Sequence, residues 1–265
     1  MTSDAPVLFH KHDEHIGVIT LNRPDNRNSM TSELLDSFHE RVQQARTEKS
    51  LRCVVITGKG RCFSAGADLR SQVQRDDLDR PLEPHERSYA MYRPFLSVLD
   101  IEVPTIGALN GHTVGGGFGL SLVCDMRVAN KEAKFGANFA RLGFSSGMAI
   151  SYILPKLVGI PKATELLFTG RLFSGEEAAD MGIVNYALPP EDVLPKALEL
   201  AKEVAHSAPL AVRDIKKLFY ENLDFNPRAA AMTEAVAQAR TIDTDDAKEG
   251  MAALLEKRQP VFKGR

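Results

Sequence analysis

The feature that most constrains this chain is a glycine-rich run at the start of an apolar segment. Residues 110–119 read Asn-Gly-His-Thr-Val-Gly-Gly-Gly-Phe-Gly, and the mostly apolar stretch 120–124 follows at once. At the start of a helix the backbone N–H groups lack intrahelical acceptors and carry a partial positive charge, and glycines leave them uncovered. The run therefore predicts a site where main-chain amides hold a developing negative oxygen.

The spacing of these glycines disfavours a nucleotide-phosphate loop. The dinucleotide pattern counted from Gly115 needs a glycine at position 120, which is Leu120, and no GxxxxGK[ST] sequence occurs in the chain. One alternative stays open, in which the glycines only permit close helix packing. A second sequence element is needed to decide between these readings.

That second element is a loop sequence directly after the largely β-branched run 53–57. Residues 58–69 read Gly-Lys-Gly-Arg-Cys-Phe-Ser-Ala-Gly-Ala-Asp-Leu. Together with Leu-Asn-Arg-Pro at 21–24, the glycine run and Cys124-Asp125, this loop resembles the crotonase (enoyl-CoA hydratase/isomerase) superfamily. Further motifs follow in matching order at 134–136, 167–170, 178–184 and 249–262. The resemblance covers nearly the whole chain and implies an α/β fold, a spiral of repeated ββα units with a helical C-terminal region.

Hydrophobic periodicity supports this fold class. Apolar residues at helical spacing predict a helix from about Thr31, and shorter apolar runs alternate with it as strands. The expected strands are 7–10, 16–21, 53–57, 103–109 and 126–129, and the glycine-led helix is expected to end near 123. Helices are expected at 190–207, 209–223, 228–242 and 245–258. We divide the chain into a spiral acyl-CoA-binding core, 1–200, and a C-terminal helical region, 201–265, for oligomerisation and pocket completion.

Composition narrows the class of partner and the compartment. The chain has 265 residues, 43% of them hydrophobic, and a formal net charge of −2. This net charge gives no overall attraction to nucleic acid or to an anionic membrane, and no apolar stretch is long enough to span a bilayer. The three cysteines form no CxxC pair, and the N-terminus lacks the pattern of a signal peptide. We expect a soluble, cytoplasmic protein.

The resemblance implies a specific site for the thioester of an acyl-CoA. The backbone N–H groups of Ala67 and Gly116 would form an oxyanion hole, in which one fixed donor contributes about 2.7–4 kcal/mol to transition-state stabilisation. Coenzyme A would lie along the 65–69 loop, and arginine would meet its phosphates. The binding residues implied are Arg27, Ala65, Asp68, Leu69, Arg70 and Gly115. Arg27 as a solvated charge and Asp68 as a turn residue are the alternatives.

The acid–base residues depart from the family pattern. Two glutamates perform hydration in the well-known hydratases, and the corresponding positions here hold Gly119 and Phe139. His112 is a candidate base, and Phe139, Asn138 and Arg141 are candidates for the acyl pocket, although each fits a structural role as well. The segment 70–87 reads either as a mobile cover or as a surface excursion without a role. Other candidates for orienting water or entering the site are Ser145, Ser146, His85, Glu86 and Tyr89.

The expected function is therefore that of an atypical enzyme of the enoyl-CoA hydratase/isomerase type, a lyase or isomerase of fatty acid metabolism. Double-bond migration and thioester hydrolysis stay open as its reaction, and a non-catalytic acyl-CoA-binding protein is the rival. No separate cofactor is expected, because coenzyme A is part of the substrate. We expect no metal site at His10, His12 and His15, and a packed thiol at Cys62. Relatives in the family commonly form trimers or dimers of trimers, and we expect the same here.

Overall fold

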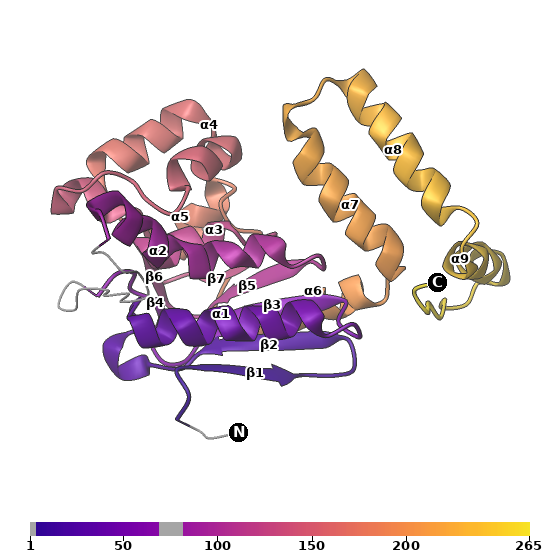
Figure 1. The fold of residues 1–265 in the computed structure, drawn as a ribbon, viewed down its shortest axis with the longest axis horizontal. Helices are drawn as coiled ribbons and strands as arrows, with labels where there is room; N and C mark the ends of the chain where they lie inside the picture. The colour runs from indigo at the N-terminus through magenta and orange to yellow at the C-terminus, as the bar shows by residue number, and fades with distance from the viewer. Residues whose placement is uncertain (1–3, 69–81) are drawn as a thin grey trace.

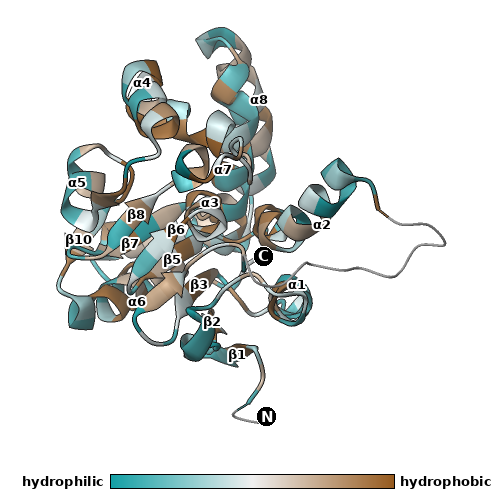
Figure 2. Cartoon of the chain, turned by 90° about the vertical axis from the view of Figure 1, so that its left-hand side faces the viewer, coloured by the Kyte–Doolittle hydropathy of each residue, from teal (hydrophilic) through white to brown (hydrophobic). Residues whose placement is uncertain are grey.

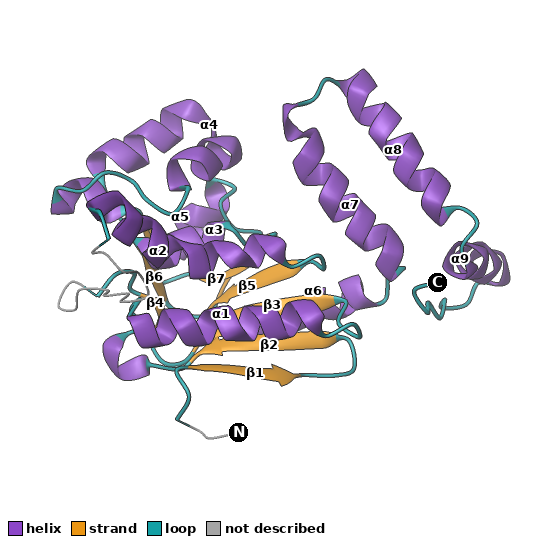
Figure 3. Cartoon of the chain, in the orientation of Figure 1, coloured by secondary structure: helices purple, strands orange, loops and turns teal. Residues whose placement is uncertain are grey.

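A six-stranded sheet forms the base of the molecule. The computed structural model describes residues 4–68 and 82–265. The strand order is β1-β2-β3-β5-β7-β10; β1 runs antiparallel to β2, and the other neighbours are parallel (Figure 3). The bounds are β1 Val7–Lys11, β2 Ile16–Leu21, β3 Cys53–Gly58, β5 Thr105–Leu109, β7 Met126–Asn130 and β10 Tyr186–Leu188.

The remaining strands form a second sheet of four strands. Its order is β4-β6-β8-β9, with β4 Cys62–Ser64, β6 His112–Val114, β8 Lys134–Gly136 and β9 Phe173–Ser174. Successive pairs, β3 with β4, β5 with β6 and β7 with β8, each contribute one strand to each sheet before a helix follows. This alternation is the spiral of ββα units expected from the sequence, and it confirms the predicted fold class.

The helices of the core cover the two faces of the large sheet. On β3, Val54 and Ile56 belong to one buried cluster, whereas Cys53 and Val55 belong to a second cluster that includes residues of α6. This alternation of side chains across a strand explains why β3 is buried on both faces. The bounds are α1 Ser32–Thr47, α2 Pro84–Leu96, α3 Gly116–Leu122, α4 Ile150–Thr169, α5 Gly175–Asp180 and α6 Pro190–Ala205. Short 3₁₀ turns lie at Pro24–Asn26, Ser97–Asp100, Asn138–Leu142 and Asn222–Asp224.

α1 shows how the sequence produces these elements. The side chain of Thr31 accepts a hydrogen bond from the N–H of Leu34 and so caps the first turn. The buried face consists of Leu34, Leu35, Phe38, Val42 and Ala45, which recur at helical spacing. Each buried aliphatic or aromatic side chain contributes about 1.5–3 kcal/mol relative to exposure. The predicted start of this helix is confirmed.

Three helices extend beyond the core as an arm. These are α7 Pro209–Glu221, α8 Pro227–Thr241 and α9 Asp245–Glu256, and they stand to one side of the sheet in Figure 1. α6 continues past residue 200 and buries Ala201 and Ala205 against the sheet, so the separate arm begins only with α7. Prolines at the first positions of α6, α7 and α8 lack an N–H that would have no acceptor there anyway.

Asp125 connects the arm to the core directly behind α3. Its carboxylate accepts hydrogen bonds from the Thr105 N–H (2.6 Å) and from the Tyr220 hydroxyl of α7 (2.7 Å). The Lys216 ammonium of α7 lies 2.8 Å from the same carboxylate. Burial is the largest cause that raises the pKa of Tyr220, and the charge of Asp125 adds to it. The C-terminal end of α3 is therefore held between β5 and the arm.

The segment 70–87 was expected to be a cover or a surface excursion, and its residues 70–81 lie outside the described part of the chain. From Pro84 onward the chain is the helix α2, with Glu83 and Glu86 in a capping box. Pro84 stands at a position where a helix tolerates proline.

Candidate functional site

The two glycine elements meet a third segment at one place, which we call the glycine junction (residues 28–30, 64–67 and 114–117). The N–H of Met30 donates to the Gly66 carbonyl at 2.8 Å, and Met30 pairs with Ala67 in a parallel bridge. A Cβ atom built on Gly66 would lie 2.8 Å from the Gly116 nitrogen and 2.8 Å from the Val114 carbonyl oxygen. The backbones of the two sequence motifs are thus in direct contact.

Both amides expected to form the oxyanion hole lie at this junction. In a parallel bridge whose bond runs from the Met30 N–H to the Gly66 carbonyl, the N–H of Ala67 points away from Met30. Gly116 is the first residue of α3, so its N–H has no intrahelical acceptor. Gly115 precedes it with φ 57° and ψ −121°, a conformation that glycine adopts easily.

Side-chain hydrogen bonds fix the loop that carries Ala67. The Asn28 amide donates to the carbonyl of Cys62 at 2.9 Å, and the Ser64 hydroxyl donates to the carbonyl of Asn28 at 2.8 Å. The Ala65 N–H donates to the carbonyl of Arg27 at 3.0 Å. Arg27 and Asn28 both have positive φ values, 60° and 53°. A backbone held in this uncommon region by its neighbours is typical of functional loops.

Arginine side chains border the junction. Arg27 is exposed, and its guanidinium makes no hydrogen bond or ion pair with any residue that the structure describes. Burial raises the pKa of the Cys62 thiol, and the positive charges of Arg27 and Arg61 oppose this shift. Both arginines therefore lie near Cys62. Sequence reasoning missed Arg61, although its place in the turn just before the Ser-Ala-Gly-Ala loop was a usable signal.

One helical turn further along α3, buried apolar side chains lie against Gly119. We call Gly119 and Met148 the apolar wall. A Cβ atom on Gly119 would lie 2.3 Å from the Met148 Cβ and 3.5 Å from the Ile150 Cδ1. Met148 is 1% exposed, and Phe139 packs partly buried against the main core. With this loop in place, position 119 has no room for any side chain.

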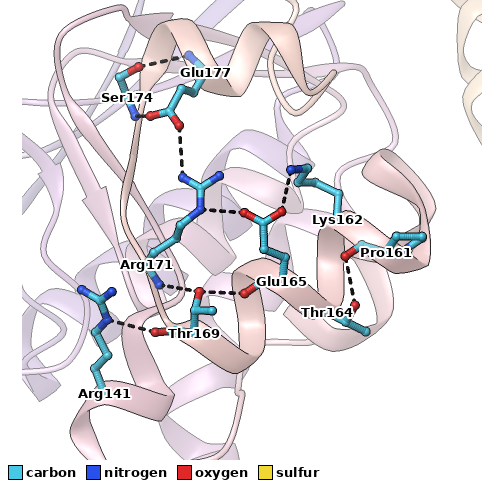
Figure 4. A network of polar contacts seen from close by, with 9 residues as sticks. All are labelled: Arg141, Pro161, Lys162, Thr164, Glu165, Thr169, Arg171, Ser174 and Glu177. Atoms are coloured by element: carbon cyan, nitrogen blue, oxygen red, sulfur yellow. Dashed lines mark hydrogen bonds and ion pairs between the residues drawn. The ribbon is translucent and has the colours of Figure 1, made fainter.

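Asn138 and Arg141 have different surroundings although they share one 3₁₀ turn. The Asn138 Oδ1 lies 3.6 Å from a Cβ atom built on Gly115, so this amide stands beside the junction. The Arg141 Nε instead donates to the Thr169 carbonyl at 2.9 Å, at the C-terminal end of α4 (Figure 4). The structure thus brings Asn138 to the site and engages Arg141 elsewhere.

The network beyond Arg141 is a surface feature of α4 and α5. Arg171 contacts Glu165 at 2.9 Å and Glu177 at 3.1 Å, and Lys162 reaches Glu165 at 2.6 Å (Figure 4). Hydrogen bonds from Lys162 and Arg171 lower the pKa of Glu165. These groups satisfy one another and stabilise the turn after α4.

His112 is exposed on β6, and its ring is engaged with the neighbouring strand. Its Nδ1 accepts a hydrogen bond from the Lys134 N–H at 3.0 Å. Because Gly116 lies four residues further on and an extended chain covers about 3.3 Å per residue, the chain itself separates His112 from the Gly116 N–H. The observed contact gives His112 a strand-joining role, while its role as a base stays a prediction.

The remaining candidates divide between the junction and the surface. Asp68 is half-buried and has a partner, while Leu69 and Arg70 lie outside the described residues. His85, Ser145 and Ser146 are exposed. The Glu86 carboxylate accepts a hydrogen bond from the Glu83 N–H at 2.9 Å, and Tyr89, 60% exposed, lines a groove between α1 and α2.

Over 4–68 and 82–265, no helix has both the length and the apolar character required to cross a membrane. Within the same ranges, no three His, Cys, Asp or Glu side chains gather as ligands for a metal ion. The three cysteines are free and buried.

The architecture and the glycine junction define a protein of the crotonase fold. The family described as Enoyl-CoA hydratase/isomerase matches residues 11–265. YngF of Bacillus subtilis (strain 168), described as an enoyl-CoA hydratase/isomerase, is 36% identical over 260 residues, covering 97% of this chain and 98% of YngF. The crotonyl-CoA hydratase of Syntrophomonas wolfei is 33% identical, covering 96% and 97%. A crystal structure of enoyl-CoA hydratase from Bacillus anthracis superposes with a TM-score of 0.91 at 32% identity, covering 98% and 100%. The chain belongs to the enoyl-CoA hydratase/isomerase family.

Proposed function

We propose that this chain binds an acyl-CoA with the thioester oxygen between the backbone N–H groups of Ala67 and Gly116. The observation that carries the proposal is the contact of Gly66 with Gly116, which brings the two donor-bearing segments to one place. Converting a thioester to an enolate or a tetrahedral adduct puts negative charge on that oxygen, and fixed backbone donors stabilise this charge without reorganising. No separate cofactor takes part in this proposal.

The nucleotide end of coenzyme A would meet the arginine side of the junction. Arg27 is exposed and unpaired within the described part of the chain, and Arg61 lies on the same side. Guanidinium groups bind phosphate through two parallel hydrogen bonds. Asn138, beside Gly115, would contact the thioester or the acyl carbons next to it.

Hydration is the reaction that this site supports least. Adding water to an enoyl thioester needs one group to activate water and another to deliver a proton. Gly119 has no side chain and no room for one, and Phe139 cannot transfer a proton. Backbone donors at Ala67 and Gly116 would stabilise an enolate or a tetrahedral adduct, and the lack of both usual acids disfavours efficient hydration. Double-bond migration would need another side chain to remove and return the proton, and thioester hydrolysis would need one to activate water.

The test is a comparison of binding and turnover under identical conditions. We expect calorimetry to show tighter binding of acyl-CoA than of free coenzyme A. We expect crotonyl-CoA hydration, measured as loss of enoyl thioester absorbance, to be slow or absent beside the crotonyl-CoA hydratase of Syntrophomonas wolfei as positive control. Turnover comparable with that enzyme would contradict the proposed loss of hydration, and equal affinity for both ligands would contradict the proposed thioester site.

A specific observation also favours a second candidate, a non-catalytic acyl-CoA-binding protein. Position 119 has no room for a side chain beside Met148, and position 139 carries a phenylalanine, so neither position offers a proton-transfer group. If acyl-CoA is bound tightly and recovered unchanged after long incubation, the binder is correct. Release of free coenzyme A would instead identify thioester hydrolysis, and a changed acyl chain would identify an isomerase or lyase.

We further propose that the arm mediates self-association as a trimer or a dimer of trimers. Large apolar side chains are exposed along it, and brown segments recur on α8 in Figure 2. The exposed residues include Ile215, Phe219, Met232, Val236, Leu254 and Leu255. Burying such side chains against another copy would remove apolar area from water. Light scattering that shows a stable monomer would contradict this proposal.

The C-terminal tail, where Phe262 and Lys263 lie, is fixed within its own chain. The Arg52 guanidinium donates to the Phe262 carbonyl at 2.7 Å, and the Lys263 N–H donates to the Asp246 carboxylate at 2.6 Å. Such a tail presents a defined surface to a neighbouring copy. The three buried free cysteines fit a reducing compartment, and we propose the cytoplasm.

A further inference from the structure

Three neighbouring strands of the four-stranded sheet lead directly into the proposed thioester site. β4, β6 and β8 run parallel to one another, so their carboxyl ends lie at the same edge of the sheet. Ala67 follows the end of β4 by three residues, Gly116 follows the end of β6 by two, and Asn138 follows the end of β8 by two. Ligands of parallel sheets bind outside the carboxyl ends of the strands. The alignment of these strands therefore sets where the two amides and the Asn138 side chain lie relative to one another.

His112 lies at the opposite, amino end of β6 and contacts both neighbouring strands there. Its N–H donates to the carbonyl of Arg61, just before β4, at 3.2 Å. Its ring Nδ1 accepts a hydrogen bond from the N–H of Lys134, the first residue of β8, at 3.0 Å. At the carboxyl end of the same two strands, the Gly115 N–H donates to the Gly136 carbonyl at 2.9 Å. β8 is thus held against β6 at both ends, and at the amino end a side chain makes the contact.

The imidazole of His112 can make this contact only in its neutral form. Its partner is a backbone N–H, so Nδ1 must supply a lone pair, whereas in an imidazolium both ring nitrogens carry hydrogen. Histidine is the side chain that changes charge between about pH 5 and 8. The contact is therefore lost as the pH falls through this range. The charged or titratable groups beside the ring are Arg61 and Cys62 on the β4 side, Lys134 on β8, and Glu132 in the turn before β8.

We propose that neutral His112 is a positioning residue for the thioester site. By fixing the amino end of β8 against β6, it sets the place of Asn138 relative to the Gly116 N–H, between which the thioester would lie. This assignment rests on the proposed function. It differs from the role of a base, because His112 acts through the two strands and touches no substrate atom. The consequence is that the protein distinguishes an acyl-CoA from free coenzyme A better when His112 is neutral.

The experiment measures by calorimetry the ratio of the affinity for butyryl-CoA to that for free coenzyme A. It is measured at about pH 7.5 and about pH 5.5, on either side of the usual histidine titration. Both ligands carry the same phosphates, so phosphate ionisation cancels in the ratio. His112→Asn keeps an acceptor as many bonds from the backbone as Nδ1 and does not titrate, whereas His112→Ala removes the acceptor. The matched control is His10→Asn, since His10 is exposed on strand β1 and its ring makes no hydrogen bond with any residue that the structure describes.

In the unmodified protein the ratio should fall about threefold to tenfold from the higher to the lower pH, which corresponds to one net hydrogen bond. His112→Asn should keep the high ratio at both pH values, His112→Ala should give the low ratio at both, and His10→Asn should follow the unmodified protein. An equal fall in His112→Asn, or no fall in the unmodified protein, would overturn the assignment. Equal weakening of both ligands by His112→Ala would show a merely structural role and overturn it as well.

Amide hydrogen exchange tests the contact itself without any ligand. At about pH 7.5, the Lys134 N–H should exchange more slowly in the unmodified protein and in His112→Asn than in His112→Ala. Equal exchange in all three proteins would overturn the role of His112 even where thioesters bind. A normal difference in exchange, together with equal affinity of the unmodified protein for butyryl-CoA and free coenzyme A, would instead overturn the proposed function. The two failures are therefore distinguishable.

Discussion

The glycine junction and the apolar wall each include a glycine of the short helix α3, and they differ in what lies against that glycine. At the junction, contact between Gly66 and Gly116 excludes side chains and leaves backbone donors at the meeting point. At the wall, the Met148 Cβ takes the space that a side chain at position 119 would need. The space beside a glycine is thus taken by main-chain atoms in the first region and by a buried side chain in the second.

The largest effect is expected from Gly66→Ala at the junction. The new methyl group would lie 2.8 Å from two backbone atoms, and the residue has φ +82°. The strained backbone alone costs about 1–3 kcal/mol of stability, and separation of the two segments should abolish acyl-CoA binding. Denaturant unfolding and calorimetry measure the two losses.

Gly143→Ala is the control for this variant. Gly143 has φ +77°, and nothing lies within 4 Å of its added Cβ, so this change introduces the strain without the contact. It should lower stability and retain acyl-CoA binding. Equal binding by both variants would mean that contact between the glycine segments is not required for the ligand.

The next effect is expected at the wall, where Gly119→Ala would place a methyl group 2.3 Å from the Met148 Cβ. Overpacking of this kind costs about 1–3 kcal/mol of the free energy of unfolding. Met148→Gly removes the opposing atom and relieves a residue at φ 58°. In a double-mutant cycle followed by urea unfolding, we expect the double variant to be more stable than the sum of the two single changes predicts. Additive costs would show that Met148 does not control position 119.

The sequence was sufficient for the features that depend on local pattern. Five of the six strands of the large sheet follow from apolar runs, whereas β10 was not expected. α1 follows from its helical spacing and its Thr31 cap, and the two glycine motifs marked the segments that meet. The departure from the family pattern at Gly119 and Phe139 stays a prediction. These features depend on residues close together in the chain or on motif order.

What the sequence could not show depends on contacts between distant residues. Nothing near position 119 indicates that Met148 lies against it, and nothing near Arg141 indicates the Thr169 carbonyl that engages its guanidinium. The same holds for His112 on β6, whose ring accepts a hydrogen bond from the Lys134 N–H on the neighbouring strand β8. The helix α2, which starts at Pro84, was not among the expected helices. Side-chain roles within a correct fold therefore needed the three-dimensional arrangement.

A smaller effect is expected from Arg27→Ala at the outer edge of the junction. Loss of a charged hydrogen-bond donor to phosphate should weaken coenzyme A binding about tenfold at low ionic strength. The affinity for an acyl-pantetheine, which lacks the nucleotide phosphates, should not change. Arg141→Ala removes the same charge from a side chain that is bonded to Thr169, and we expect it to leave coenzyme A affinity unchanged. If Arg141→Ala weakened coenzyme A binding more than Arg27→Ala, the phosphate site would lie at the 3₁₀ turn Asn138–Leu142 instead.

The smallest effect is expected from the thiols, because Cys62 lies two residues before the junction segment 64–67, whereas Cys53 and Cys124 are almost completely buried in the interior. Burial raises the pKa of Cys53 and Cys124 to about 12, and it raises that of Cys62 while Arg27 and Arg61 oppose the shift. Since the folded values exceed the ordinary value of 9.0, the unfolded thiols ionise first as pH rises. The contribution of the neutral buried thiols to the free energy of unfolding is therefore fully present below pH 9.0 and should be lost as the pH rises above it. In alkylation followed by mass spectrometry, Cys62 should react before the other two cysteines. Simultaneous labelling of all three would indicate global unfolding and contradict the preferential reactivity of Cys62.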